Sequence, residues 1–350
     1  MDQRQDQLKI WLHEQLPECT GFESSEWQLV PVSGDASFRR YFRVISGAKS
    51  WIAVDAPPDK EDSRPFIAVA ETLADQGVTV PDVHKYDLQL GFMLLGDLGD
   101  DLYLGQLNEQ NADKLYTDAL NELFLIQQCQ DLKQGSLPLY DHPLLSREVE
   151  LFREWFLEKL LGLELTETDH FEIDRLFHYV IDCALEQPSV FVHRDFHSRN
   201  IMYRAGATPG IIDFQDAVRG PVTYDLVSLF RDCYIAWPDD QVYHWVEQYR
   251  QRLITNGSMM PDSGHFQRWF DLMGAQRHLK AIGIFSRLLI RDGKAGYLDD
   301  IPRTFSYLLA VTKKEYGLEP TENWLMQKVL PALYESEHFS DDLLDQWLKP

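Results

Sequence analysis

The segment that most constrains this chain is a loop of charged residues between short apolar stretches. The run 189–192 is mostly apolar and β-branched, which is typical of a buried strand. It leads into the loop His193 to Asn200, and the apolar stretches 201–203 and 210–212 follow before Asp213. Apolar residues at helical spacing lie on both sides of this segment. The chain is therefore expected to combine sheet and helix, with polar loops at the ends of short strands.

Three side chains of this segment have the chemistry that phosphoryl transfer from ATP requires. Asp195 can meet an attacking hydroxyl and take its proton. Asn200, five residues later, and Asp213 offer the amide and carboxylate oxygens that Mg²⁺ prefers. An Asp and an Asn at this spacing are common in loops and caps, but the strands before and after them favour the catalytic interpretation. We expect Asp195 as the base and Asn200 and Asp213 as Mg²⁺ ligands.

Other polar residues nearby are expected to support this loop. His193 and His197 flank Asp195, and we interpret both as braces that act through their ring nitrogens. Asp225 follows Gly220-Pro221 at the start of a helix, where a carboxylate can cap the helix N-terminus. We expect Asp225 to brace the catalytic segment and not to bind metal.

The first hundred residues alternate in the manner of strands, and the rest of the chain is mostly helical in pattern. The expected strands are 27–32, 38–45, 51–54, 78–80 and 92–95, with a helix over 61–76. The expected helices beyond Gly99 are 109–130, 144–161 and 170–186, followed by nearly continuous helix after Pro221. This pattern predicts an α+β fold of two lobes. Residues 1–97 form a small antiparallel β-sheet lobe with one main helix that binds nucleotide, and residues 98–350 form a larger, mostly helical lobe for catalysis and substrate.

Charge and cysteine content exclude several kinds of partner. The formal charge of −23 argues against nucleic acid or an anionic membrane as the main partner. No apolar run reaches the length of a transmembrane helix, and the N-terminus is not patterned as a signal peptide. The four cysteines are widely spaced, without a Cys-x-x-Cys pair, as in reduced proteins. We expect a cytoplasmic protein with no obligate protein partner.

The central motifs resemble those of a known superfamily. His193 to Asn200, Asp213-Phe214 and Gly220 to Leu226 are similar to the aminoglycoside phosphotransferase and choline kinase superfamily, relatives of protein kinases. The resemblance covers nearly the whole chain in order. It implies a two-lobed, protein-kinase-like fold with ATP in the cleft.

The same resemblance implies roles for individual residues. It makes Asp195 the base and places Mg²⁺ at Asn200 and Asp213. It also implies that a hinge binds adenine through its backbone. The hinge residues are Gly96, Asp97 and Leu98.

A narrower resemblance concerns the acceptor. The segments Ser33 to Val44, Val54 to Pro58 and His193 to Asn200 are similar to the N-acetylmuramate/N-acetylglucosamine 1-kinases of peptidoglycan recycling. Members of that family phosphorylate the anomeric C1 hydroxyl with ATP. The resemblance implies the same reaction on the same amino sugars here.

The nucleotide site departs from the usual kinase pattern in two ways. Its phosphate loop has the single glycine Gly34, flanked by the hydroxyls of Ser33 and Ser37. The third strand ends in Asp55, where kinases usually carry a phosphate-binding Lys. Arg40 or Arg43 is our hypothesis for a replacement phosphate contact, with a plain surface role as the open alternative.

The acceptor also determines which charges are needed near Asp195. N-acetylmuramate carries a lactyl carboxylate, so an arginine near the base would help to bind it. An acetylated sugar also calls for neutral donors and aromatic contact. The candidates for acceptor contacts are Arg194, Arg199, Arg219, Gln215 and Tyr234, and Arg231 belongs to the same group of arginines.

Other functions remain open at this point. The acid-rich C-terminal region would suit a cationic aminoglycoside as acceptor. A second alternative is a silent regulator that only binds nucleotide, given Asp55 in place of the lysine, although a pure binder has no need of Asp195. A protein kinase is disfavoured, because the segment from Asp213 to Asp225 is short for an activation loop.

Overall fold

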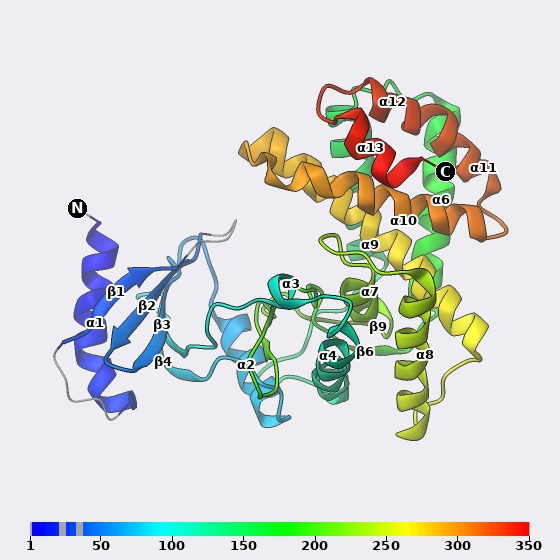
Figure 1. The fold of residues 1–350 in the computed structure, drawn as a ribbon. Helices are drawn as coiled ribbons and strands as arrows, with labels where there is room; N and C mark the ends of the chain where they lie inside the picture. The colour runs from blue at the N-terminus through cyan, green and yellow to red at the C-terminus, as the bar shows by residue number, and fades with distance from the viewer. Residues whose placement is uncertain (1, 21–25, 33–37, 350) are drawn as a thin grey trace. The chain divides into compact units, whose positions relative to one another are not determined.

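The computed structural model describes residues 2–20, 26–32 and 38–349 (Figure 1). The chain divides into two compact units. Unit 1 comprises Met1–Leu137 with Arg199–Ala217, and unit 2 comprises Pro138–Ser198 with Val218–Pro350. Unit 1 thus extends beyond the lobe boundary expected near residue 97 and takes in the end of the catalytic loop and the segment that follows it. The assignment of nucleotide and acceptor to separate lobes stays a prediction.

Unit 1 is built around an antiparallel sheet with the strand order β1-β2-β3-β5-β4. The elements of unit 1 are α1 (Gln3–Thr20), β1 (Gln28–Pro31), β2 (Arg40–Ser46), β3 (Lys49–Asp55), α2 (Arg64–Asp75), β4 (Val83–Asp87), β5 (Phe92–Gly96), α3 (Tyr103–Gln106), α4 (Ala112–Gln128), β7 (Ile201–Met202) and β8 (Gly210–Ile211). The antiparallel sheet and the α+β class agree with the sequence prediction. The expected strand 78–80 is wrong. The amide of Thr79 donates to the Glu122 carboxylate at 2.8 Å instead of to a strand, and β4 begins at Val83.

Helix α1 covers one face of this sheet (Figure 1). The register of β2 and β3 pairs Phe42 with Ala53 and Val44 with Trp51, so these side chains share that face. The residues buried between α1 and the sheet are Leu8, Trp11, Leu12, Leu16, Phe42, Val44, Trp51, Ala53, Phe92 and Leu94. Burial of each large apolar side chain contributes about 1.5 to 3 kcal/mol. This layer attaches α1 firmly to the sheet.

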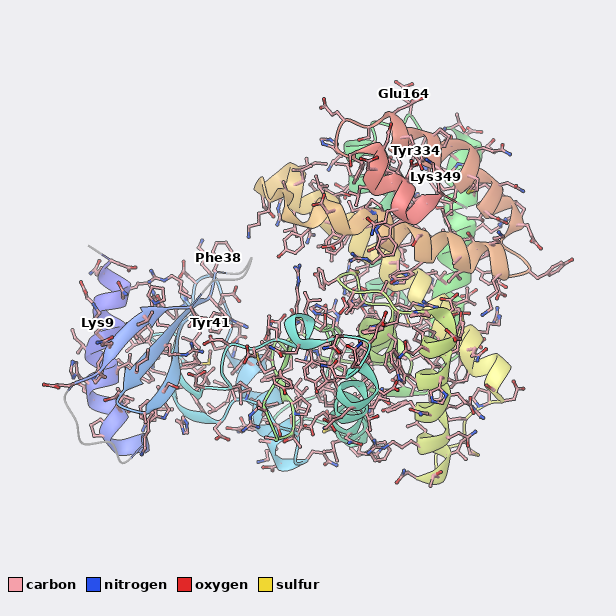
Figure 2. The ribbon with its side chains drawn as sticks, in the orientation of Figure 1. Lys9, Phe38, Tyr41, Glu164, Tyr334 and Lys349 are labelled. Carbon is pink, nitrogen blue, oxygen red and sulfur yellow. The ribbon has the colours of Figure 1, made fainter. Side chains whose placement is uncertain are left out.

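The alternation of the strands sends their other side chains to the opposite face. Tyr41, labelled in Figure 2, and Arg43 belong to that face on β2, as do Ile52 and Val54 on β3. Asp55 pairs in register with Arg40 and therefore lies on the face that α1 covers. This placement decides which charged residues of the sheet can meet a ligand on its other face.

Unit 2 is largely helical and contains a short two-stranded pairing of β6 with β9. The elements of unit 2 are α5 (His142–Leu151), η1 (Phe152–Leu160), α6 (Glu167–Leu185), β6 (Ser189–Val192), β9 (Val218–Pro221), α7 (Tyr224–Phe230), α8 (Asp239–Thr255), α9 (Ser263–Asp292), η2 (Ala295–Asp300), α10 (Ile301–Lys314), α11 (Glu319–Trp324), η3 (Leu325–Val329), α12 (Leu330–Glu335) and α13 (Asp341–Leu348). The helices expected over 109–130, 144–161 and 170–186 correspond to α4, to α5 continued by η1, and to α6.

The long helix α9 is the central element of unit 2 and packs against α5, η1, α6, α7, α8 and α10. A helix surrounded in this way is apolar on most sides, yet the middle of α9 buries Gln276, Arg277, His278 and Lys280. Gly283 allows the close contact with the end of α5, because a Cβ there would lie 2.4 Å from the carbonyl carbon of Leu151. This contact fixes the distance between α9 and the end of α5, and with it the position of the polar residues in the middle of α9.

In the part of the chain that the structure describes, no helix has an apolar stretch long enough to cross a bilayer.

Candidate functional site

The catalytic loop begins where β6 ends, and Asp225 holds its first turn. The backbone amides of His193 and Arg194 donate to the two Asp225 carboxylate oxygens at 2.8 and 3.0 Å. Arg194 has φ +77°, a left-handed conformation that is uncommon for a residue with a side chain. Asp225 is fully buried in the first turn of α7 and does not cap that helix, because its oxygens accept from the loop. The strained turn before Asp195 is thus held by a buried acceptor.

The far end of the loop is held by Asp232. One Asp232 oxygen accepts from the Ser198 amide at 2.9 Å and from the Ser198 hydroxyl at 2.6 Å. Within the loop, the Asp195 amide donates to Nδ1 of His193 at 3.2 Å, and His193 is fully buried. His197 packs edge-on against Tyr234, with 5.3 Å between ring centroids. Carboxylates in the first turn of α7 and just after its end therefore fix the loop that carries Asp195.

Asp195 is half-buried and strongly acidic. Burial alone would raise the pKa of its carboxyl group, but the positive charges of Lys280, His197 and Arg277 outweigh burial and lower this pKa to about 2. Asp195 is therefore ionised at any physiological pH. An ionised carboxylate in reach of solvent can accept a hydrogen bond from a substrate hydroxyl.

A buried cluster behind the loop engages Arg194. The Arg194 guanidinium forms an ion pair with Glu148 and lies over the Tyr140 ring, 5.7 Å from its centroid. Lys280 Nζ lies 3.1 Å from the same Glu148 carboxylate, and Tyr140 donates its hydroxyl proton to it. Arg194, a predicted acceptor contact, thus has a carboxylate partner inside unit 2. The sequence analysis did not identify Glu148, which is far from the motif along the chain.

Arg277 is a further cation near the loop that the sequence analysis missed. Its side chain is 5% exposed, and its Nη1 atom donates to the Cys233 sulfur at 3.7 Å. Burial lowers the pKa of Arg277, while its electrostatic interactions with Cys233, Tyr224 and Asp195 raise it, and the net direction is upward. The sequence did contain a signal for this residue. Four polar residues interrupt an apolar helical pattern there, namely Gln276, Arg277, His278 and Lys280.

The predicted metal ligands lie together in unit 1 (Asn200 and Asp213). The β7–β8 pairing aligns Ile201 with Ile211, and the amide of Ile212 donates to the Asn200 carbonyl at 3.1 Å. The Asn200 side-chain amide donates to Asp213 Oδ2 at 3.1 Å. Asp213 has φ +66°, again a left-handed conformation.

The donor set at this pair fits Mg²⁺. The Asn200 amide oxygen and the Asp213 carboxylate are hard oxygen donors, and Mg²⁺ commonly uses one or two protein ligands plus water and phosphate. Among the described residues no group of three or more His, Cys, Asp or Glu side chains is placed to hold a metal. Gln215, predicted as an acceptor contact, donates to Asp213 Oδ1 at 2.8 Å and orients that carboxylate.

Asp55 does not carry an unbalanced charge on the sheet. It is fully buried, and its oxygens accept from Arg4 Nε of α1 at 2.8 Å and from Arg40 Nε of β2 at 3.0 Å. Arg40 also pairs with Asp2. Asp55 is therefore an ion-paired anchor that attaches α1 to the sheet.

Arg43 lies on the other face of the sheet and contacts the predicted hinge. It donates to Asp97 Oδ2 at 2.7 Å and to Asp100 Oδ2 at 2.6 Å. The Gly96 amide donates to the Asp82 carbonyl at 2.8 Å. Both arginines predicted as phosphate contacts thus have carboxylate partners, and their nucleotide roles stay predictions.

The roles of the remaining predicted site residues stay predictions. Ser33, Gly34 and Ser37 lie outside the described residues. Arg199 belongs to unit 1, whereas Arg219 belongs to β9 of unit 2. Arg219 bonds through its backbone to Pro138 and Tyr140 at 2.8 and 2.9 Å. Leu98 would meet any Cβ added at Gly210.

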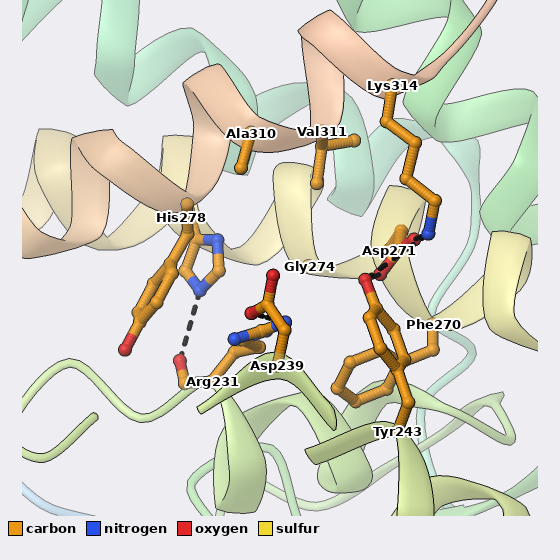
Figure 3. A pocket seen from close by; sticks show the side chains of 11 residues that line it. Arg231, Asp239, Tyr243, Phe270, Asp271, Gly274, His278, Ala310, Val311 and Lys314 are labelled. Atoms are coloured by element: carbon orange, nitrogen blue, oxygen red, sulfur yellow. Dashed lines mark hydrogen bonds and ion pairs between the residues drawn. The ribbon is translucent and has the colours of Figure 1, made fainter. Parts of the chain in front are cut away.

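A small pocket in unit 2 is lined by residues of α8, α9 and α10 (Figure 3). Its cations already have partners, since Arg231 Nη2 lies 2.7 Å from Asp239 and Lys314 Nζ lies 2.5 Å from Asp271. His278 is buried in its wall with Nε2 3.1 Å from the Arg231 carbonyl oxygen. Burial lowers the pKa of His278 to about 3, so the ring is neutral. The pocket is thus charge-balanced.

Comparisons with known proteins identify the family of this chain. The model of the phosphotransferase enzyme family matches residues 28–261. The N-acetylmuramate/N-acetylglucosamine kinase of Pseudomonas putida is 46% identical over 88% of this chain and 91% of its own length. The enzyme of the same name from Neisseria meningitidis is 41% identical over 93% of this chain and 96% of its own length.

A solved structure extends the likeness to the fold. The choline kinase of Cryptosporidium parvum matches with a TM-score of 0.60 and 13% identity, over 92% of this chain and 99% of that chain. This likeness confirms the kinase-like α+β fold that the sequence predicts. With most of its length matched, this chain belongs to the phosphotransferase enzyme family and, within it, to the family of the N-acetylmuramate/N-acetylglucosamine kinases.

Proposed function

We propose that this enzyme uses ATP to phosphorylate the anomeric C1 hydroxyl of N-acetylmuramate and N-acetylglucosamine. The observation that carries the proposal is the 46% identity over 91% of the length of a kinase named for these two sugars. The supporting geometry is an ionised, half-buried Asp195 on a loop held at both ends. A hydroxyl acceptor fits this site because the carboxylate can accept its proton.

The low pKa of Asp195 suits an anomeric hydroxyl. A hemiacetal hydroxyl is more acidic than that of an ordinary alcohol, so it needs only a weak base. Asp195 orients the hydroxyl by accepting its hydrogen bond and takes the proton as the O–P bond forms. The cations Lys280 and Arg277 keep the carboxylate ionised until then. His193, Asp225 and Asp232 act by positioning the loop.

The proposed Mg²⁺ would be held by Asn200 and Asp213. Such an ion, when bound, offsets the negative charge of the ATP phosphate oxygens. Gln215 keeps the Asp213 carboxylate oriented through its 2.8 Å hydrogen bond. Nucleotide contacts from the loop of Gly34 and from the hinge at Asp97, and a cytoplasmic location, remain part of the proposal.

The test is an ATP-consumption assay on a panel of acceptors. The panel contains N-acetylmuramate, N-acetylglucosamine, N-acetylgalactosamine, kanamycin and choline, each with and without Mg²⁺. We expect turnover on the first two sugars, only with Mg²⁺, and a product that NMR identifies as the 1-phosphate. Turnover of kanamycin or choline in preference to both sugars, or phosphorylation at another hydroxyl, would overturn the proposal.

A further inference from the structure

Two cations on α9 lie near the catalytic loop and differ in how their charge is matched. Arg277 and Lys280 are one helical turn apart and both are buried. Lys280 Nζ lies 3.1 Å from Glu148 and 3.1 Å from the Tyr224 hydroxyl. For Arg277, the described residues offer the Cys233 sulfur at 3.7 Å and no carboxylate within ion-pairing distance. The guanidinium of Arg277 therefore has N–H groups that could donate hydrogen bonds to a ligand.

The position of Arg277 places these N–H groups beside the reacting group. Cys233, its sulfur partner, directly follows Asp232, which binds the loop residue Ser198. The positive charge of Arg277 is also among those that keep Asp195 ionised. A buried guanidinium without an ion-pair partner is costly. An anionic ligand at this point would offset that cost.

The two proposed acceptors differ by one group that fits Arg277. N-acetylmuramate is N-acetylglucosamine with a lactyl ether, and the lactyl carboxylate is its only charge. A guanidinium binds a carboxylate through two parallel hydrogen bonds, which a lysine cannot reproduce. We propose that Arg277 binds the lactyl carboxylate of N-acetylmuramate and so determines the preference between the two sugars. This inference rests on the proposed function.

The other cations of unit 2 near the loop are less suited to this role. Arg194 is paired with Glu148. The pocket of Figure 3 offers Arg231 and Lys314, and each already has an aspartate within 2.7 Å. A carboxylate ligand there would have to compete with an existing ion pair. Arg277 has no such competitor among the described residues.

The test compares Arg277→Met with the pocket variant Lys314→Met as a matched loss of one cation. Steady-state kinetics give kcat and KM for both sugars. In Arg277→Met, kcat/KM for N-acetylmuramate should fall about 10- to 100-fold, mainly through KM, as expected for loss of a charged hydrogen bond. For N-acetylglucosamine, kcat/KM should fall only by the factor that losing a positive charge near Asp195 imposes on both sugars, so the ratio of the two kcat/KM values should still shift toward N-acetylglucosamine. Lys314→Met should leave the ratio of the two sugars unchanged.

A second measurement uses the wild-type enzyme and so does not depend on whether a variant folds. The methyl ester of N-acetylmuramate removes the charge from the sugar, so the wild-type enzyme should use it less well than the acid, by a similar factor. Arg277→Lys should retain part of the preference, and Arg277→Met should no longer distinguish acid from ester.

Four outcomes overturn the inference. An equal loss on both sugars in Arg277→Met would indicate a contact with the transferred phosphoryl group or a structural role. No loss on either sugar, no discrimination against the ester, or a selective loss in Lys314→Met would each contradict it. A wild-type enzyme inactive on both sugars would instead overturn the proposed function, so the two failures are distinguishable.

Discussion

Two carboxylates, one in each unit, are kept ionised in different ways. Asp55 is fully buried and accepts from arginines of α1 and β2 at 2.8 and 3.0 Å. Asp195 is half-buried, and the positive charges that lower its pKa belong to Lys280, His197 and Arg277. Close pairing makes the first carboxylate an anchor. Compensation by surrounding charges keeps the second ionised while a substrate can still reach it.

The largest expected effect comes from removing the charge of the second carboxylate. Asp195→Asn keeps the size of the side chain but cannot take a proton, so kcat should fall about 100- to 10,000-fold. The measurement is steady-state kinetics with N-acetylglucosamine, together with calorimetric titration of ATP, which should still bind. Full activity in this variant would exclude Asp195 as the base.

The first carboxylate should respond in stability and not in chemistry. Arg40→Met leaves Asp55 with Arg4 alone, which should lower the free energy of unfolding by about 1 to 3 kcal/mol, as for a buried acceptor that loses a donor. Urea denaturation of the variant and the wild type measures this change. The control is Lys114→Met, which removes an exposed i,i+4 pair with Asp118 and should leave the urea midpoint unchanged. Equal midpoints in the two variants would contradict the anchor role of Asp55.

A third carboxylate, Asp225, extends the comparison with a smaller, pH-dependent effect. Burial raises its pKa to about 7, although two backbone amides oppose this shift. A carboxyl group whose pKa is raised on folding binds its proton more tightly in the folded state. Its stabilising contribution is fully present below the unfolded pKa, near 3.8, and is lost as pH rises through about 7.

The corresponding variant is Asp225→Asn, measured by thermal unfolding between pH 4 and pH 8. The wild type should lose more Tm than the variant over this range, by a few degrees, because about 1 kcal/mol corresponds to roughly 2 °C in a chain of this size. The difference between the two profiles isolates Asp225 from other titrating groups. Parallel profiles would show that its pKa is not raised.

The sequence was sufficient for what depends on local pattern. Alternation predicted β2 and β3, and helical spacing predicted α4 and α6. Asp195 and Asn200 could be predicted as site residues because they belong to one short motif. Asn200 and Asp213 could be paired because the strands between them form a hairpin.

What the sequence did not reveal depends on contacts between distant residues. Arg4 neutralises Asp55 from 51 positions away, and no local pattern joins the N-terminal helix to the end of β3. Glu148 pairs with Arg194 across 46 positions. Arg277 reaches the loop through the packing of α9, which only the assembled unit defines. Long-range pairing of charges was therefore the part that pattern analysis could not supply.

The glycine at position 283 has a consequence for redesign of the acceptor site. It seats α9 against the backbone of Leu151, so any side chain there would push the helix outward, and Arg277 with it. An engineer who wants a sugar kinase with a new preference should vary position 277 and leave position 283 untouched. Substitution at position 277 changes which substituent of the sugar the enzyme recognises. Substitution at position 283 displaces the residue that recognises it.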